Sequence, residues 1–196
     1  MALLAAVALM LGAPAGTAGA FEGEPILIQD RHVRVTDVQI HGVGLDDAAP
    51  LTAEISAVLD RYLGGAVVTG LLTGQPADVA DAFTSAARAR LGSDDRPILV
   101  EDEILRPAVV DVRRFRADLL VLSGPGKVAE VVVANISHLA VGFGGDTGQV
   151  RVGRDGQLVF VHQDGAWRID SYDLEVKRDR SPLPPLSLLW PFGREA

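Results

Sequence analysis

Three side chains near the end of the chain are of types that could move a proton: Asp170, Tyr172 and Asp173. On a concave sheet, a tyrosine beside a carboxylate can stabilise an enolate or act as an acid or a base. The alternative is structural: the Tyr172 ring packs in the core with its hydroxyl at the rim, and the two acids face water. We favour the structural interpretation and expect no catalytic residue, with these three and His138 as the candidates if there is one.

The four histidines, His32, His41, His138 and His162, show neither an i,i+4 nor a His-x-His spacing. Such spacings bring two imidazoles together, so the sequence gives no support to a metal site. His138 lies in a predicted strand and could point into a cavity as an acid or a base; the alternatives are a solvent-facing or a hydrogen-bonded position. We expect no metal and no cofactor.

The run at 142–148, Gly-Phe-Gly-Gly-Asp-Thr-Gly, has some of the glycines of a dinucleotide-binding loop. That motif requires glycine where Thr147 stands, and a helix after the loop, where a strand is predicted. A connection between strands fits better. The acidic run at 101–103 is predicted to be a solvated turn, and no serine lies in the G-x-S-x-G pattern of hydrolases.

Length and composition limit the possible classes. The chain has 196 residues, of which 48% are apolar, enough for one domain with a core and extensions. Its net charge of -8 argues against a nucleic-acid partner, because binding to phosphates needs a basic face. The absence of cysteine excludes disulfides, thiolate metal sites and cysteine nucleophiles.

The N-terminal segment carries the prediction of location. Residues 1–21 have no charged side chain, and Ala-Gly-Ala at 18–20 fits a signal-peptidase site. Residues 1–20 are therefore predicted to be a signal peptide or, since about 20 apolar residues can span a bilayer, a membrane anchor. Signal peptides usually begin with basic residues, and this segment has none. A start placed too far downstream would account for their absence. We expect an extracytoplasmic protein, secreted or attached to the cell membrane.

Two helices are predicted in the first half of the chain. Apolar residues recur at three- and four-residue steps over 51–72, with Thr52 as the expected N-cap. Gly64 and Gly65 in its middle indicate close approach of another backbone or a kink, or else a tolerated weak point. The second helix is expected from Pro76 to Leu91.

The rest of the pattern is that of strands. Alternation over 32–43 slips at Asp37, as in a bulged strand or an extended arm. One or two strands are predicted at 109–122 and another at 127–141, followed by a hairpin that turns at Asp164-Gly165. In its second strand, a bulge near Asp170-Ser171 would bring Trp167, Ile169 and Leu174 to one core.

Helices followed by long, bent antiparallel strands make an α+β order. The last hairpin contains Asp-Gly-Ala-Trp-Arg-Ile-Asp-Ser-Tyr-Asp-Leu at 164–174. This segment and the order of elements resemble the nuclear transport factor 2-like cone fold of SnoaL-like and ketosteroid-isomerase-like proteins. They are similar in particular to exported actinobacterial Mce-associated or uncharacterised secreted proteins.

The resemblance implies N-terminal helices packed in a strongly curved antiparallel sheet, a cone-like half barrel. In the isomerase branch of that family, an inward aspartate and a Tyr/Asp pair carry catalysis. No residue of this chain is matched to those positions, so the resemblance transfers no catalytic role. Function in such a scaffold belongs to the site and not to the fold.

The predicted organisation is an export segment at 1–20, an extended arm at 21–50, the cone-fold domain at 51–178 and a proline-rich tail at 179–196. The expected function is that of a non-catalytic cell-envelope domain that binds a partner protein or a small apolar ligand. Homodimer formation through the sheet is a further expectation. The alternative is a cofactor-independent isomerase or cyclase that uses the cone cavity. Trp190 and Phe192 could contact a partner or a membrane surface.

Overall fold

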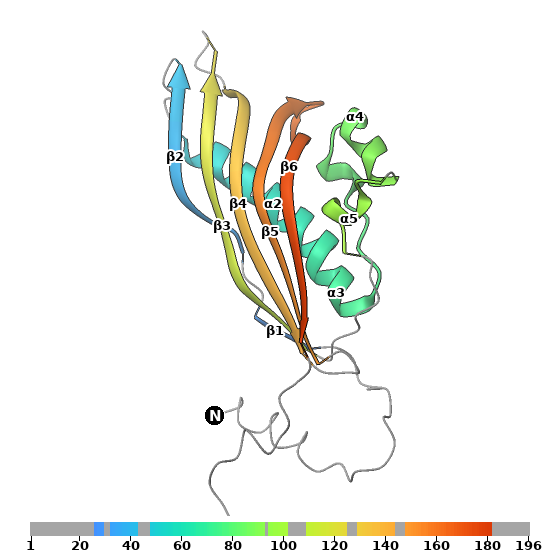
Figure 1. The fold of residues 1–196 in the computed structure, drawn as a ribbon. Coiled ribbons are helices and arrows are strands. Elements are labelled where there is room, and N and C mark those ends of the chain that lie inside the picture. The colour runs from blue at the N-terminus through green and yellow to red at the C-terminus, as the bar shows by residue number, and fades with distance from the viewer. Residues whose placement is uncertain are drawn as a thin grey trace, which may run out of the picture.

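The computed structural model describes residues 26–29, 32–42, 48–92, 94–101, 109–124, 129–143 and 148–181. The predicted export segment and the tail with Trp190 and Phe192 lie outside the described residues. Figure 1 shows one sheet of long strands, with helices gathered on one of its faces and beside one of its edges. The fold is therefore α+β.

The sheet has six strands. They are β1 Ile26–Gln29, β2 Arg34–Gly42, β3 Val109–Ser123, β4 Ala129–Phe143, β5 Gln149–Gln163 and β6 Ala166–Ser181. Strands β3 to β6 form an antiparallel meander, whereas β1 and β2 both pair with β3 in parallel. The sheet is thus mixed, and the expectation of an antiparallel sheet was wrong for its first two strands. Parallel pairing needs a long crossover connection, and the helices between β2 and β3 provide it.

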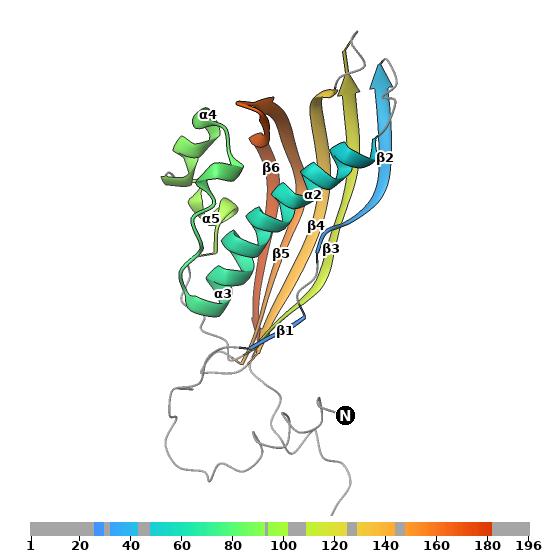
Figure 2. The same ribbon diagram turned by 180° about the vertical axis from the view of Figure 1, so that it is seen from behind.

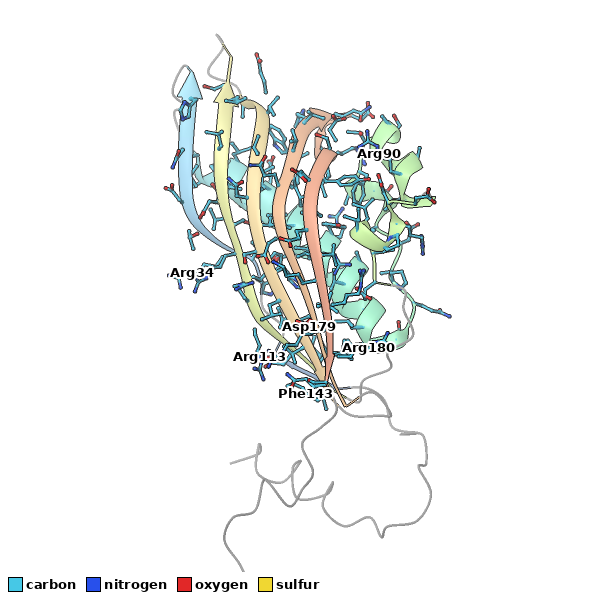
Figure 3. The ribbon with its side chains drawn as sticks, viewed as in Figure 1. Arg34, Arg90, Arg113, Phe143, Asp179 and Arg180 are labelled. Atoms are coloured by element: carbon cyan, nitrogen blue, oxygen red, sulfur yellow. The ribbon has the colours of Figure 1, made fainter. Side chains whose placement is uncertain are left out.

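The segment expected as an arm or a bulged strand is a strand. The pairing of β2 with β3 shifts register between Val35 and Asp37, which confirms the predicted irregularity at that point. A second bulge lies in β3, where the register with β4 shifts between Val112 and Arg114. The extra residue, Arg113, places its guanidinium 5.5 Å from the ring centroid of Phe143, at the end of the sheet where both are labelled in Figure 3.

One continuous helix of 25 residues crosses a face of the sheet, as Figure 2 shows. It consists of α2 Ala49–Leu63, the π-helical segment η2 Gly64–Thr69 and α3 Gly70–Thr73. The predicted helix at 51–72 is confirmed. Its sheet-facing residues include Ile55, Leu59, Tyr62 and Leu63, all with no exposed surface. The helix is long and apolar enough to span a membrane, but half of its most apolar window is buried, as expected of a core helix.

The predicted N-cap at Thr52 was wrong. The N-cap is Ala48, which makes no side-chain cap, and Pro50 stands in the first turn. Proline is favoured there because its ring presets a helical φ and its missing N–H has no intrahelical acceptor at that position. The helix therefore begins earlier, and the Thr52 hydroxyl instead donates to the Ala48 carbonyl at 2.9 Å.

Glycines allow two segments to approach the helix closely. A Cβ added at Gly65 would lie 2.9 Å from Val79 Cγ1, and one added at Gly70 would overlap the carbonyl oxygen of Glu101. Gly65 also accepts a backbone hydrogen bond of 3.0 Å from Ala77. Close backbone approach at the Gly64-Gly65 pair is therefore confirmed for Gly65, whereas a Cβ at Gly64 would meet nothing within 4 Å.

The predicted second helix was wrong as a single element. The chain forms short turns instead: η3 Ala80–Ala82, α4 Ser85–Arg88, η4 Ala89–Gly92 and α5 Arg96–Leu99. The interruption arises because Phe83 is extended and bridges Ile169 of β6, and Thr84 N donates to Ile169 O at 2.9 Å. The Thr84 hydroxyl then caps α4 by accepting from Ala87 N. The spacing of apolar residues within 76–91 cannot reveal this pairing, because the partner strand β6 lies much later in the chain.

The last hairpin follows the prediction. Asp164 has φ 53° and Gly165 has φ 77°, the left-handed pair that a two-residue hairpin turn requires. In β6, Ile169 pairs with Phe160 and Ser171 pairs with Val159, so Asp170 is the extra residue of a bulge. Trp167 and Ile169, before the bulge, and Leu174, after it, are all buried. This confirms that the bulge brings residues from both parts of the strand to one core.

The prediction of a solvated turn at 101–103 was wrong for Glu101, whose side chain is 1% exposed. Arg154 Nη2 lies 3.4 Å from Glu101 Oε2, and Arg178 Nε lies 3.1 Å from the same oxygen. Arg154 is itself fully buried. The partners stand on β5 and β6, far along the chain, so the acidic run appeared unpaired in the sequence. We call these three residues, of which Arg178 is only half-buried, the ion triad.

The triad anchors the segment 96–101 to both layers. Arg154 Nε donates to the Ile98 carbonyl at 3.1 Å, and the Arg178 guanidinium donates to the Pro97 carbonyl. From the helix side, the Tyr62 hydroxyl donates to the Leu99 carbonyl at 2.9 Å. The Glu101 N–H donates to Ala66 O, inside the π-helical segment, at 2.8 Å. The segment 96–101 is therefore held between the central helix and the last two strands.

Replacing Glu101 with glutamine tests the triad. The change leaves the buried Arg154 cation without its counter-charge, and we expect the free energy of unfolding to fall by about 3–5 kcal/mol. The matched control is Glu175→Gln, which removes the solvent-exposed pair with Lys177, 3.1 Å apart, and should change stability by less than about 1 kcal/mol. Urea unfolding of the three proteins provides the measurement; equal losses for both variants would contradict the anchoring role.

Candidate functional site

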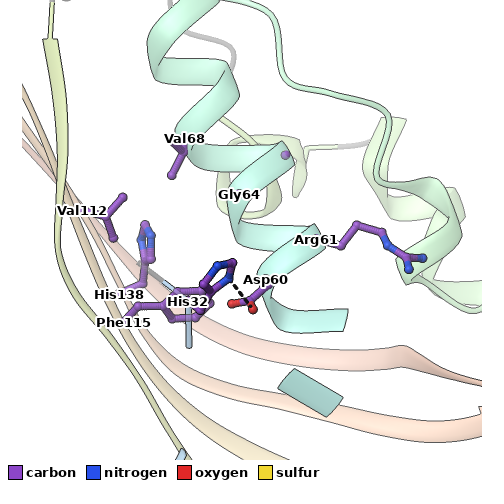
Figure 4. A pocket seen from close by; sticks show the side chains of 9 residues that line it. His32, Asp60, Arg61, Gly64, Val68, Val112, Phe115 and His138 are labelled. Atoms are coloured by element: carbon purple, nitrogen blue, oxygen red, sulfur yellow. Dashed lines mark hydrogen bonds and ion pairs between the residues drawn. The ribbon is translucent and has the colours of Figure 1, made fainter. Parts of the chain in front are cut away.

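A cavity of about 230 Å³ lies between the central helix and strands β3 and β4 (Figure 4). It is lined by His32, Asp60, Arg61, Gly64, Gly65, Val68, Val112, Phe115 and His138. The helix thus gives the cavity two adjacent residues without side chains, and no atom occupies the place of a Cβ at Gly64. Gly64, which costs helix propensity, therefore leaves space at this point, whereas the Cβ position of Gly65 faces Val79.

Strand geometry sets the opposite wall. Because Arg113 is the extra residue of the β3 bulge, Val112 and Phe115 both lie on the inner face, although three positions separate them. Phe115 pairs with His138 of β4. His138 continues the inward alternation of Ala134, Ile136 and Ala140, all buried. A histidine therefore occupies a position that the strand pattern assigns to the core.

His138 is 1% exposed, and neither of its ring nitrogens has a hydrogen-bond partner among the described residues. Its ring meets the Phe115 ring edge to face, with centroids 5.2 Å apart. Burial first, and then the positive charges of Arg154 and Arg114, together lower the pKa of His138 from 6.5 to about 3. The imidazole is therefore neutral at ordinary pH.

The rim of the cavity is polar and internally paired. Asp60 Oδ1 accepts a hydrogen bond of 2.6 Å from Val33 N, and Asp60 Oδ2 lies 3.1 Å from His32 Nδ1. The His32 side chain is 81% exposed, so this side of the cavity reaches solvent. Figure 4 shows Arg61 pointing away from the cavity, whereas His138 lies beside Val112 and Phe115. The one polar group deep in the cavity is thus the imidazole.

The other candidate residues lie elsewhere. The Thr84 hydroxyl donates to Asp170 Oδ1 at 3.1 Å, and Asp173 is exposed. The Tyr172 hydroxyl donates to Asp95 Oδ2 at 2.6 Å, and the Arg90 guanidinium lies 5.6 Å from the tyrosine ring centroid. Burial, followed by the bond to Asp95, raises the pKa of Tyr172 to about 12. None of these three candidates lines the cavity; His138 alone does.

The sequence did not identify Asp60 or Phe115 as part of a site. Asp60 stands among the apolar positions of the predicted helix at 51–72, and Phe115 stands in the segment at 109–122 that is predicted to be extended. Only the glycine pair pointed to this part of the helix, as a place of unusual packing. The site therefore combines three elements that no spacing in the sequence connects.

The groups of the cavity are better suited to hydrogen bonding than to proton transfer near neutral pH. A general base works best with a pKa near the working pH, and the lowered pKa of His138 makes the ring a weak base. The carboxylate at the rim, Asp60, already accepts from Val33 and pairs with His32. Within the described ranges, no group of three or more histidine or acidic residues is placed to hold a metal ion. A neutral imidazole still offers one hydrogen-bond donor and one acceptor.

The burial of neutral His138 predicts a dependence of stability on pH. The unfolded chain takes up a proton near pH 6.5 and the folded chain only near pH 3, so the unfolded state binds more protons between these values. The stabilisation is complete above pH 6.5 and is lost as the pH falls, by up to about 1.4 kcal/mol per unit. His138→Phe should remove this part of the slope in urea unfolding between pH 6.5 and 4. An unchanged slope would show that the ring is not buried in its neutral form.

Comparisons with known protein families, with curated proteins and with solved structures find no match. The functional argument therefore starts from the cavity itself. Its three features are an apolar wall, a paired polar rim and one buried neutral imidazole. Together they make this cavity the candidate functional site of the chain.

Proposed function

We propose that this chain is an exported cell-envelope domain that binds a small apolar ligand in the cavity beneath its central helix, without catalysing a reaction. The proposal rests on one observation: a buried His138, whose ring nitrogens have no protein partner in the described structure, lies against the apolar deep wall of the pocket. A cavity of about 150 Å³ lined by apolar side chains is large enough to hold benzene. The cavity here, about 230 Å³, has room for a somewhat larger molecule.

Two further features support this function. The central helix packs on a face of the bent sheet, the arrangement that the resemblance to the nuclear transport factor 2-like cone implies, and the cavity lies between this helix and strands β3 and β4. The apolar segment at 1–20 supports export to the envelope. The alternative, an isomerase or cyclase, has less support because Asp170, Tyr172 and Asp173 lie away from the cavity.

A variant that fills the cavity tests ligand binding. Val68 lines the cavity and is 7% exposed, so Val68→Phe should occupy the space that a ligand needs. We expect toluene or naphthalene to raise the melting temperature of the wild-type protein, as any ligand of the folded state does, and to leave that of Val68→Phe unchanged. The control is Ala53→Phe, on the exposed side of the same helix, which should keep the response.

Thermal unfolding followed by circular dichroism, with and without the hydrocarbon, gives the shift for each protein. A wild-type protein that does not respond to either compound would contradict the proposed function. An equal response in wild type and Val68→Phe would place the bound hydrocarbon elsewhere. Naphthalene and toluene together bracket the size that the cavity can accept.

A second candidate function, self-association, is favoured by the outer face of the sheet. Six apolar side chains lie there in two adjacent rows across β3, β4 and β5: Leu122, Val131 and Val161 in one row, and Leu120, Val133 and Val159 in the next. They alternate with buried inner residues and are only partly covered, and Leu122 is 41% exposed. Contiguous exposed apolar surface of this kind often marks a contact with another protein. We call these six residues the outer apolar strip.

We propose a second copy of the chain as the occupant of the outer apolar strip. In a twofold dimer the same patch lies on both subunits, so two strips would cover each other. Leu122→Lys should therefore shift the sedimentation profile from dimer to monomer. The control, Asn135→Lys, adds the same charge at an exposed position of β4 outside the strip and should leave the dimer intact. A wild-type protein that sediments as a monomer at 100 μM would contradict this candidate.

A further inference from the structure

We infer that the cavity selects neutral, ring-shaped molecules that carry a hydroxyl group, and that this hydroxyl bonds to His138. The inference rests on the proposed binding function and adds the chemical class of the ligand. Nearly all buried side-chain polar atoms in folded proteins have a hydrogen-bond partner. Both nitrogens of His138 lack one among the described residues, and the ring borders the cavity. A polar group on the ligand is the partner that this position can accept.

The charge of the ligand follows from the surroundings of His138. Arg154 and Arg114 both act on the ring as positive charges, which disfavours a cationic ligand. Neither arginine lines the cavity, and Val68, Val112 and Phe115, which line its deep part, carry no charge that could pair with an anion. Moving an ion into such surroundings without a counter-charge is far more costly than moving a neutral polar group. A neutral ligand is therefore selected.

The kind of polar group follows from the chemistry of a neutral imidazole. One of its nitrogens donates and the other accepts, and a hydroxyl can do either. A hydroxyl therefore matches His138 in both tautomers, whereas a carbonyl matches only the nitrogen that carries the proton. The two nitrogens could also serve two hydroxyls of one ligand.

The shape of the ligand follows from the wall. The Phe115 and His138 rings both line the cavity and stand edge to face at 88°. Aromatic molecules pack well against such rings, by offset stacking or edge-to-face contact. A volume of about 230 Å³ suits one ring or two fused rings. Phenol and 2-naphthol are thus the probes, with toluene and naphthalene as their counterparts without a hydroxyl.

The experiment compares the four probes on the wild-type chain and on His138→Phe, which keeps a ring but removes both nitrogens. Dissociation constants come from isothermal titration calorimetry at pH 7, where phenols are neutral. The readout is the ratio of hydrocarbon to phenol dissociation constants, because this ratio cancels changes in general packing. We expect the ratio to fall about tenfold or more in His138→Phe, as a hydrogen bond to a buried group is lost. His138→Leu, which has no ring, should show the same fall.

The outcomes separate the inference from the function on which it rests. Suppose that hydrocarbons and phenols both bind the wild-type chain, but the ratio of their dissociation constants is the same in His138→Phe. This result would overturn the hydroxyl inference and leave the binding function standing. No binding of any probe to wild type would overturn both. If the variants do not fold, nitrogen-15 resonances of His138 in the wild-type chain decide: phenol must shift them more than toluene does, because only phenol can bond to a ring nitrogen. Unshifted resonances under saturating phenol would overturn the inference.

Discussion

The buried contact of Glu101 with Arg154 and Arg178 is the constraint on which the arrangement of the two layers depends. A carboxylate and a guanidinium without solvent are stable together only when each satisfies the other, so the segment 96–101 has one place to lie. From that place its backbone bonds to Tyr62 and Ala66 of the central helix. The helix is thereby fixed along its second half, where the glycines and the cavity are. The position of the cavity is in this sense a consequence of an ion pair outside it.

Local pattern predicted the regular elements because their causes are local. The stripe over 51–72, the turn at Asp164-Gly165 and the bulge at Asp170 each follow from a period or a φ requirement within a few residues. The failures have distant causes. The bridge from Phe83 to Ile169 interrupts the second helix, and the arginines that bury Glu101 stand 53 and 77 residues further along. No window of the sequence contains both members of such a pair.

In the candidate site, too, the features with local causes could be predicted and those with distant causes could not. His138 could be named from its position in a strand, because alternation predicts that every second residue of β4 faces inward. That its ring nitrogens would lack a protein partner could not be predicted, since this depends on Phe115, on the β3 bulge and on the space beside Gly64. The proton-transfer candidates on β6 were chosen by residue type. Their places are set by contacts with Thr84 and Asp95, which the sequence leaves open.

The parallel pairing of β1 and β2 with β3 has a consequence for the order of assembly. The meander from β3 to β6 joins neighbours through short connections, so it can form early, whereas β2 must wait for a partner about 80 residues later, as in the contact of Thr36 with Asp118. During synthesis the first strands therefore leave the ribosome long before they can be paired. A chain that completes its sheet last at its N-terminal edge stays open on that side until most of it has been made.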